Sequence, residues 1–526
     1  MPLSLGALAT RAGVLAGITI IGCSLPGEGR VDVFTEEEWE TISQFGPLPE
    51  PRVNTTNQYA DNEDAAKLAQ RLFFEKSYSN KLIVIDGTLG VIGDKGKVNC
   101  ASCHDPKSYY TDVRSRPNAT SLGINWTQRN TPTLVNNVYY TWGSWGGKDD
   151  NPWAQGSNGS ESSQNFGGNR LEFAHVVFRK YRADYDALFP VPLDPALDSK
   201  HPMASRFPAS GKPKASMSAA DGPWELMASE DRDIINTILA NTGKAFEAYE
   251  RKLVSRDSPL DRYIAGDYAA LTPGQKRGLK LFIGKAACVD CHSGPTFSDQ
   301  DFHNTGVPQV GASVPRTDNG RYDDIQRTLS NTFNGAGKYS DDPDFGAAKL
   351  VGQDPVDEQK GKFRTQSLRH IEKTGPYMHT GELTTLEDVV RFYNWGGGTS
   401  NFAGTKHPAM VPLDLSFQEE ADLVAFMKAL TGEPPPEEWG ADTALTELVV
   451  TKSGTGVGKV TSNPAGIDCP TDCVEQVATG KVLVLTAMAE AGSTFIGWGG
   501  SCTGTTSTCS VTLDSDKTVT VAFTTP

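Results

Sequence analysis

CASCH at residues 100–104 and CVDCH at residues 288–292 are two copies of one five-residue pattern, and they decide the fold class of this chain. Cys-x-x-Cys-His is the pattern at which a c-type haem is attached, because the thiols bind the porphyrin and the adjacent histidine reaches the iron. Zinc and a redox dithiol are the alternatives, but neither requires the trailing histidine. The sequence therefore predicts two covalently bound haems c, held by Cys100, Cys103 and His104 and by Cys288, Cys291 and His292.

Each copy is followed by an aromatic residue, a serine or threonine, and an aspartate, at residues 110–112 and 297–299. A single match in a long chain can arise by chance. Two matches with the same downstream step indicate a duplicated haem module.

The composition is typical of a globular protein, and 526 residues are enough for about three domains. A formal net charge of -15 argues against nucleic acid or an anionic lipid surface as a partner. After the N-terminus, no stretch approaches the apolar length of a membrane span.

The first 22 residues are predicted to be a signal peptide, because a short apolar stretch follows Arg11. Residues 20–23 resemble a bacterial lipoprotein box, in which Cys23 is lipidated after cleavage; the alternative is an ordinary signal peptide cleaved nearby. Either way we expect an exported protein, periplasmic or at the cell surface, and the lipoprotein reading favours the outer membrane. Its only membrane contact is then a lipid anchor at Cys23. Attached haem and disulfides both suit an oxidising compartment.

The fold class expected is mainly α, with two cytochrome c-like haem domains and a small all-β C-terminal domain with disulfides. Residues 23–60 are rich in Pro, Gly, Glu and Asn and are predicted to form a tether. Helical periodicity predicts an N-terminal haem domain at 61–255 and a C-terminal haem domain at 256–436. Residues 441–526 alternate in short valine-rich runs separated by glycine, proline and asparagine, which indicates strands.

Further strings in residues 65–432, at 304–308, 363–369, 374–379 and 385–394, resemble the bacterial di-haem cytochrome c peroxidases. That superfamily includes the methylamine dehydrogenase maturation enzyme MauG. The resemblance implies two helical haem domains that face each other, with calcium and a tryptophan between the haems. It makes His104 and His292 the proximal ligands.

The resemblance also assigns the residues between the haems. Asn130 matches the calcium-binding asparagine, while Thr374 and Pro376 match the positions that supply main-chain carbonyls, and such oxygens suit Ca²⁺. Trp145 stands ten residues before Gln155, which is the family spacing between the inter-haem tryptophan and the distal glutamine. Taken alone, Asn130 is more typical of a turn cap and Trp145 of a core or loop anchor.

The sixth ligand of the second haem is expected to be Tyr393, fourteen residues after His379, where the peroxidases have methionine and MauG has tyrosine. A phenolate favours high-valent iron, whereas a thioether raises the potential. Met378 and Met410 remain alternative ligands.

The first haem is expected to have an open iron that binds peroxide, because no histidine lies between His104 and His175. Gln155 is its polar contact. Asn165 stands where the family has the acid–base glutamate, and an amide donates a hydrogen bond but cannot exchange a proton in that role. Glu161 or Glu172 are the possible substitutes.

The C-terminal residues 466–469, 495–500 and 502–509 resemble a repeat module of bacterial surface and secreted proteins. In such a domain short loops favour disulfides Cys469–Cys473 and Cys502–Cys509; metal binding by these cysteines is the alternative. The module is expected to be an accessory without catalytic residues.

The leading hypothesis is a di-haem peroxidase-type oxidoreductase, in which hydrogen peroxide reacts at the first haem and Trp145 shares the oxidising equivalents with the second. Tyr393 favours MauG-like oxidation of a protein or aromatic substrate. The alternatives are peroxide detoxification with a small cytochrome or copper protein as electron donor, and a non-catalytic di-haem electron-transfer protein. A further alternative is a surface-binding module whose haems are vestigial.

Overall fold

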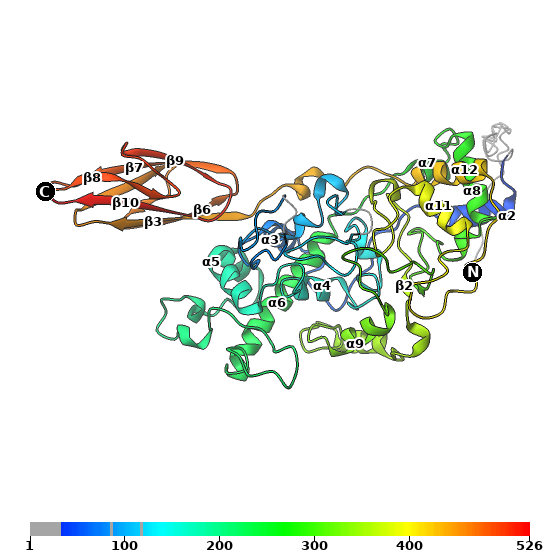
Figure 1. Cartoon of the computed structure of the whole chain (residues 1–526), viewed down its shortest axis with the longest axis horizontal. Helices are drawn as coiled ribbons and strands as arrows, with labels where there is room; N and C mark the ends of the chain where they lie inside the picture. Colours follow the sequence, from blue (N-terminus) through cyan, green and yellow to red (C-terminus); the bar gives the residue numbers. More distant parts are fainter. Residues whose placement is uncertain (1–32, 85–87, 116–118) are drawn as a thin grey trace, which may run out of the picture.

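A computed structural model describes residues 33–84, 88–115 and 119–526. The predicted signal peptide and Cys23 lie outside the described residues. The molecule is elongated: an all-β domain forms one end and the helices form the rest (Figure 1). In the part of the chain that the structure describes, no helix is long and apolar enough to cross a membrane.

The first helical unit, residues 61–255, is built from α3 (Glu63–Phe74), α4 (Pro152–Gly159), α5 (Arg170–Leu188) and α6 (Ser229–Glu250). Helix α3 begins at Asn62, whose side chain accepts a hydrogen bond from the Ala65 amide. Helices α4 and α6 cross closely because Gly243 has no side chain; a Cβ there would lie 2.0 Å from Ser157 Oγ. Helix α5 is kinked at Tyr181, which has non-helical dihedral angles.

The second helical unit, residues 256–436, contains α7 (Pro259–Ile264), α8 (Pro273–Ile283), α9 (Arg321–Ser330), α10 (Pro343–Leu350), α11 (Leu386–Asn394) and α12 (Phe417–Lys428). Its separate core forms where α8 and α12 pack, with Phe282, Phe297 and Phe426 buried. A short hairpin pairs β1 (Phe302–His303) with β2 (Phe363–Arg364). The segment that contains α9 and α10 reaches across to the first unit, where Phe333 is buried in the core.

Short 3₁₀ helices connect these elements. They are η1 (Cys100–Ser102), η2 (Pro106–Ser108), η3 (Asn137–Tyr139), η4 (Pro195–Leu197), η5 (Ala204–Arg206), η6 (Cys288–Asp290), η7 (Asp357–Gln359), η8 (Ile371–Lys373) and η9 (Glu437–Gly440). Two of them, η1 and η6, begin at the first cysteine of each haem motif.

The structure differs from the tether expected at residues 23–60. Helix α2 (Glu36–Ser43) begins at Thr35 with a reciprocal capping box to Glu38. Ile42 and Phe45 are fully buried in the core of the second unit, where the ring of Phe45 stacks on Phe297. This segment is polar in composition, but a few apolar side chains are enough to fix it.

The same segment then continues to the first unit. The Asn57 side chain donates hydrogen bonds to the Lys244 carbonyl and to Glu247, both on α6. Residues 33–62 therefore contact both helical units and join them.

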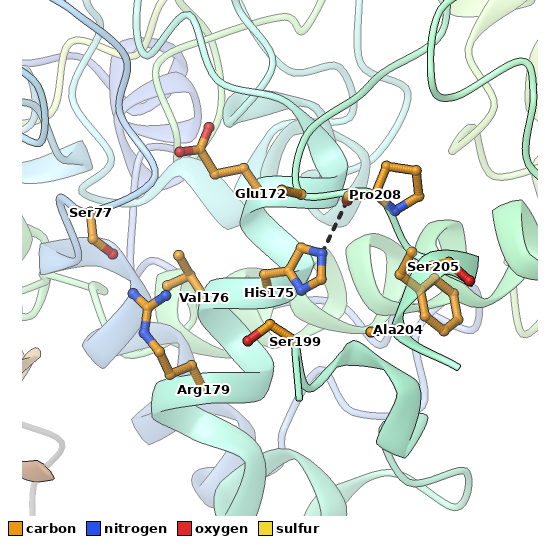
Figure 2. Close-up of a pocket in the computed structure, with 11 residues that line it drawn as sticks. Ser77, Glu172, His175, Val176, Arg179, Ser199, Ala204, Ser205 and Pro208 are labelled. Carbon is orange, nitrogen blue, oxygen red and sulfur yellow. Dashed lines mark hydrogen bonds between the residues drawn. The ribbon is translucent and has the colours of Figure 1, made fainter. Parts of the chain in front are cut away.

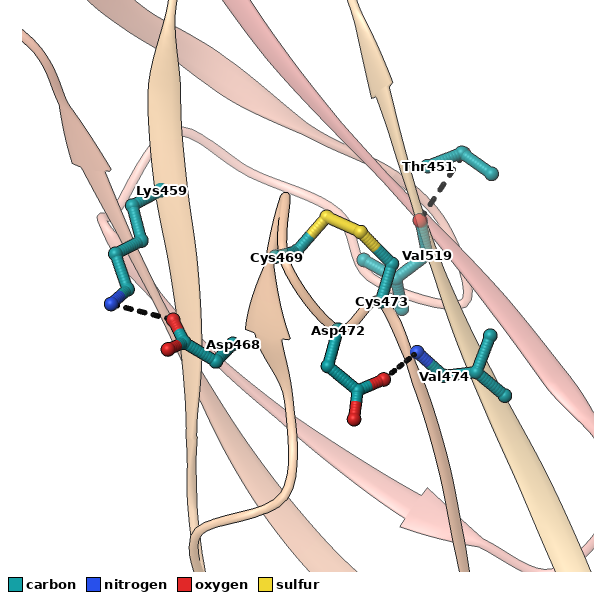
Figure 3. The surroundings of a disulfide bond; sticks show 8 residues. All are labelled: Thr451, Lys459, Asp468, Cys469, Asp472, Cys473, Val474 and Val519. Atoms are coloured by element: carbon teal, nitrogen blue, oxygen red, sulfur yellow. Dashed lines mark hydrogen bonds and ion pairs between the residues drawn. A yellow bond between two sulfur atoms is a disulfide. The ribbon is translucent and has the colours of Figure 1, made fainter.

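The C-terminal domain is a sandwich of two four-stranded sheets, as the alternating pattern predicted. The strands are β3 (Leu445–Ser453), β4 (Gly458–Asn463), β5 (Asp468–Cys469), β6 (Val474–Ala478), β7 (Lys481–Ala489), β8 (Thr494–Gly500), β9 (Thr508–Leu513) and β10 (Lys517–Thr524). The sheet orders are β6-β3-β10-β8 and β5-β4-β7-β9, and only β3 and β10 pair in parallel, with Val450 opposite Val519. Both predicted disulfides are confirmed, Cys469–Cys473 (Figure 3) and Cys502–Cys509.

The sandwich is joined to the first helical unit through a buried ammonium group. Lys180 lies next to the kink of α5, its side chain is 1% exposed, and its Nζ lies 2.7 Å from Asp516 and 3.2 Å from Glu75. The same Nζ donates a hydrogen bond to the Leu445 carbonyl at the start of β3, while the Leu445 amide donates to Tyr181. The two domains therefore share one polar network at this junction.

Candidate functional site

The two Cys-x-x-Cys-His motifs have the same local structure. In each, a 3₁₀ turn brings the histidine amide to the carbonyl of the first cysteine, at 2.9 Å from His104 to Cys100 and 2.8 Å from His292 to Cys288. The turn places both thiols and the imidazole on one short segment. The duplication predicted from sequence is therefore a duplication of geometry.

The aromatic residue downstream of each motif fixes the imidazole. His104 Nδ1 lies 3.0 Å from the Tyr110 carbonyl, and His292 Nδ1 lies 3.0 Å from the Phe297 carbonyl. Both aromatic residues have positive φ, 54° and 51°, which turns their carbonyls toward the rings. A histidine that donates Nδ1–H to a carbonyl presents Nε2 to a metal.

Burial keeps these histidines neutral. It lowers the pKa of His104 to about 4, and it also lowers the pKa of His292. Neutral imidazole is the form that binds iron. Burial likewise raises the pKa of the thiols of Cys100, Cys103 and Cys288 to about 12. These thiols are therefore neutral where no metal or cofactor is bound, as buried cysteines commonly are.

Arg364 supplies a further test of whether a haem fits. It is 2% exposed, burial lowers its pKa to about 10, and its Nε and Nη1 have no hydrogen-bond partner among the described residues. Its Nη2 donates only to Gln366, and its guanidinium lies 3.3 Å from the ring centre of Tyr140. A buried cation without an anion is costly. The carboxylates of a haem are anions that can accept hydrogen bonds from these two nitrogens. The residues present therefore fit the group.

Tyr393 lies on α11 close to the second motif. Burial raises the pKa of its hydroxyl, and the charges of Cys288 and Cys291 contribute to the rise. No hydrogen bond from the described residues reaches that hydroxyl. A metal cation bound beside this hydroxyl would favour its deprotonated form, the phenolate, as it does for other coordinating groups.

The two alternative ligands lie in different places. Met378 has a positive φ of 67° in the turn before His379. Met410 Cε lies 2.8 Å from the point where a Cβ on Gly397 would stand, just beyond the end of α11. Met410 therefore lies near the same end of α11 as Tyr393.

Gln155 and Asn165 are held in different ways. Gln155 is on α4, and its buried Oε1 has no hydrogen-bond partner in the described chain. Asn165 is held by its main chain, since its carbonyl accepts from the Ile124 amide. Ile124 is two residues after Leu122, and the Leu122 carbonyl contacts Cys103 Sγ at 3.5 Å. Asn165 thus lies near the first haem motif.

Neither substitute carboxylate is free to act there. Glu161 is held by Arg170 through two hydrogen bonds of 2.8 and 2.6 Å. Glu172 pairs with Lys95 and accepts from Asn169 at 3.1 Å. The expectation that one of them replaces the family glutamate is therefore not supported.

His175 does not face the first haem motif either. Its Nδ1 lies 3.0 Å from the Leu197 carbonyl and its Nε2 lies 3.1 Å from the Pro208 carbonyl (Figure 2). It lines a cavity of about 500 Å³ between α5 and residues 199–209. Both ring nitrogens of His175 therefore face main-chain carbonyls of its own unit.

Trp145, Asn130 and Pro376 meet between the two helical units. The Asn130 Nδ2 donates to the Pro376 carbonyl at 2.7 Å, and the Asn130 amide donates to the His379 carbonyl at 2.7 Å. Thr374 lies two residues before Pro376 in the same loop. The Asn130 Oδ1 accepts hydrogen bonds from the hydroxyls of Ser115 and Ser121, and rotation of the amide would turn this oxygen to the Pro376 side. The oxygen donors then suit Ca²⁺.

Some residues around this centre have no signal in the sequence. Arg129 bonds Asp318 twice at 2.7 Å and Asp324 at 2.6 Å, which fixes the residue before Asn130. Asp149 is buried beside Gln155, since its Cβ and Gln155 Oε1 each lie 3.1 Å from the point where a Cβ on Gly143 would stand. These contacts join distant parts of the chain, so no local pattern indicates them.

Two family models match the chain. One, described as di-haem cytochrome c peroxidase, matches residues 63–269, and one described as a divergent InlB B-repeat domain matches residues 448–525. The chain is 32% identical to cytochrome-c peroxidase IdrP2 of Denitromonas iodatirespirans, over 71% of this chain and 83% of that protein. It is 27% identical to the methylamine utilization protein MauG of Methylorubrum extorquens, over 74% of this chain and 82% of that protein.

Solved structures agree with these matches. A MauG-like protein associated with microbial copper homeostasis has a TM-score of 0.50 at 26% identity, covering 75% of this chain and 97% of that protein. The diheme peroxidase BthA from Burkholderia thailandensis has a TM-score of 0.50 at 20% identity and shows the same fold. The mainly helical fold with an all-β end, and the resemblance inferred from the motifs, are therefore confirmed.

Proposed function

Because this chain belongs to the di-haem cytochrome c peroxidase family, we propose that it reduces hydrogen peroxide at the first haem and shares the oxidising equivalents with a second haem ligated by Tyr393. Family membership makes it an oxidoreductase of the peroxidase class with two haems c. The observation that carries the finer proposal is the position of Tyr393 within electrostatic reach of both cysteines of the second motif.

When bound, the haems supply the electron transfer and the reduction of peroxide to water. The residues of the chain orient the reactants. His104, held by the Tyr110 carbonyl, would bind the iron of the first haem, whereas His175 faces two main-chain carbonyls instead. The amide of Gln155 then holds the peroxide by hydrogen bonding. The proposed reaction consumes two electrons and two protons for each peroxide and forms two waters.

Trp145 is proposed to pass electrons between the haems. It lies between the two helical units, and its carbonyl accepts a hydrogen bond of 2.7 Å from the Arg364 amide. Asn130, Thr374 and Pro376 are proposed to bind Ca²⁺ beside it, which holds the two units in register. Export, with a lipid anchor at Cys23 and a periplasmic or outer-membrane location, completes the proposal.

Two substrates are consistent with this site. Tyr393 favours MauG-like oxidation of a protein or aromatic substrate, because an anionic oxygen ligand stabilises oxidised iron. The second candidate is peroxide detoxification with a small cytochrome or copper protein as donor, and it is favoured by the relatives named cytochrome-c peroxidases. If the protein only transfers electrons, we expect low-spin iron at both haems.

Electron paramagnetic resonance of the oxidised holoprotein tests the proposal. We expect one high-spin ferric signal from the first haem and one low-spin signal that changes in Tyr393→Phe and Tyr393→Met. Tyr322→Phe, a tyrosine that contacts Lys360 instead, is the matched control. Two low-spin signals that are the same in all variants, and no spectral response to peroxide, would contradict the proposal.

A further inference from the structure

Two cations lie close to the ring of Trp142. The guanidinium of Arg321 lies 4.3 Å from the centre of its ring, and the Nζ of Lys349 lies 4.7 Å from it. The indole is 9% exposed, so solvent screens these charges little. Each cation is attracted to the neutral ring. The same charges oppose loss of an electron from that ring.

Neighbouring carboxylates offset these charges only in part: Asp150 acts on Lys349, and Asp324 and Asp301 act on Arg321. Arg321 donates to the carbonyls of Gly146 and Gly147 and to the Gln353 amide oxygen. Lys349 donates to the carbonyls of Thr141 and Asp150. In residues 33–84, 88–115 and 119–526, neither cation forms an ion pair. Burial lowers the pKa of Lys349 to about 8, so the ammonium is mostly charged at pH 7.

Trp145, three residues later, has the opposite environment. Its Nε1 donates to the Asn130 carbonyl at 2.7 Å, and its ring meets the edge of His379 at a centroid distance of 6.1 Å. Within the described parts of the chain, no cation lies over this ring. A carbonyl acceptor stabilises positive charge on an indole, because it faces the N–H dipole with partial negative charge.

Trp142 is next in the chain to a glycine that lies against the proposed peroxide contact. Gly143 faces Gln155, whose Oε1 is 3.1 Å from the point where a Cβ on that glycine would stand. The two tryptophans are therefore compared by their electrostatic surroundings.

We propose that Arg321 and Lys349 are positioning residues that keep Trp142 reduced, so that the electrons drawn to the first haem arrive through Trp145. The inference rests on the proposed function. In each transfer the indole of Trp145 would lose one electron to the first haem and regain one from the second haem, which the electron donor or the oxidised substrate of the proposed function would reduce in turn. Two such transfers supply the two electrons that one hydrogen peroxide takes, with two protons, to form two waters.

Oxidative footprinting of the holoprotein tests this selection. Trp142 and Trp145 lie in one tryptic peptide, between Arg129 and Lys148, so fragment ions compare their oxidation directly. With excess hydrogen peroxide and no donor, we expect oxidation at Trp145 to exceed that at Trp142 by about fivefold or more. Lys349→Met is expected to raise the share at Trp142 about threefold.

Two further variants control the charge. Lys349→Arg keeps the cation and is expected to leave the ratio unchanged. Lys338→Met removes an exposed lysine that contacts Tyr339 and is also expected to leave it unchanged. Equal oxidation of the two indoles in the wild type, or no change in Lys349→Met, would overturn the inference.

Trp142→Phe gives an independent measurement if Lys349→Met does not fold. The rate of electron exchange between the haems is expected to be unchanged in Trp142→Phe and slowed in Trp145→Phe. Equal slowing in both variants would overturn the inference. If the absorption spectrum of the wild type does not respond to peroxide, the proposed function is wrong as well. If the spectrum responds but Trp142 and Trp145 are oxidised equally, only this inference is wrong.

Discussion

The indole Nε1 of Trp145 donates a hydrogen bond of 2.7 Å to the main-chain carbonyl of Asn130. The residue proposed to pass electrons and the residue proposed to bind calcium are thus one hydrogen-bonded pair. A change in the main chain at Asn130 therefore directly alters a hydrogen bond of the Trp145 indole.

Asn130→Ala is expected to lower bound calcium and to slow electron exchange between the haems by about tenfold, because alanine lacks the side-chain oxygen proposed to bind the ion. Metal analysis and stopped-flow absorption measure the two effects. Chelation of calcium from the wild type should reproduce the slowing, and chelation should add nothing in the variant. A variant that loses calcium with unchanged electron exchange would contradict the coupling.

Asn165→Glu is expected to raise the rate of reaction with peroxide by about tenfold or more, since a carboxylate can exchange the proton that an amide cannot. The main-chain bond to Ile124 is independent of the side chain, so the loop is expected to keep its place. Stopped-flow mixing with peroxide measures the rate. Asn165→Gln is the matched control, and an equal rise in that variant would show that proton exchange is not the cause.

His370 is expected to make the protein less stable in mild acid. It is buried between the helical units, Gly432 donates its amide to Nδ1, and burial lowers the pKa of the imidazole to about 4. The unfolded chain binds this proton below about pH 6.5, so stability falls as the pH falls from 6.5 toward 4, by at most about 3 kcal/mol.

Melting temperatures of wild type and His370→Gln at pH 5 and pH 7.5 check this expectation. The difference between the two pH values should be smaller in the variant. His201→Gln, at a histidine outside this contact, should keep the wild-type difference. An unchanged pH dependence in His370→Gln would show that other groups control acid stability.

Lys180→Met is expected to loosen the β sandwich from the haem domains. Removal of the ammonium leaves Glu75 and Asp516 without their shared partner, which costs about 3 kcal/mol or more at a buried site. Limited proteolysis should cut faster in the connection at residues 433–443, with the haem absorption unchanged. Arg182→Met, which removes a half-exposed partner of Asp186 on the same helix, should have a much smaller effect.

The parts of this molecule that sequence predicts are those set by local pattern. The haem motifs, the helical periodicity and the alternating strands all follow from residues a few positions apart. Even the aromatic step after each motif is local, and the structure shows its use: the carbonyls of Tyr110 and Phe297 orient the two histidines.

The features that the sequence does not predict depend on contacts between residues far apart in the chain. Glu161 looked available until the structure placed it against Arg170, and the cations beside Trp142 come from residues 321 and 349. Helix α2 has only eight residues, three of them glutamates in its first turn, so its buried face is too narrow to give a periodic signal. Its partners lie more than 200 residues later.

That leading segment also sets an order of assembly. Phe45 packs on Phe282 and Phe297, and its carbonyl accepts from Arg369. A chain made from its N-terminus must therefore extend by more than 300 residues before this segment can reach all its native partners. This segment is among the first of the described residues to be synthesised and among the last to reach its native contacts.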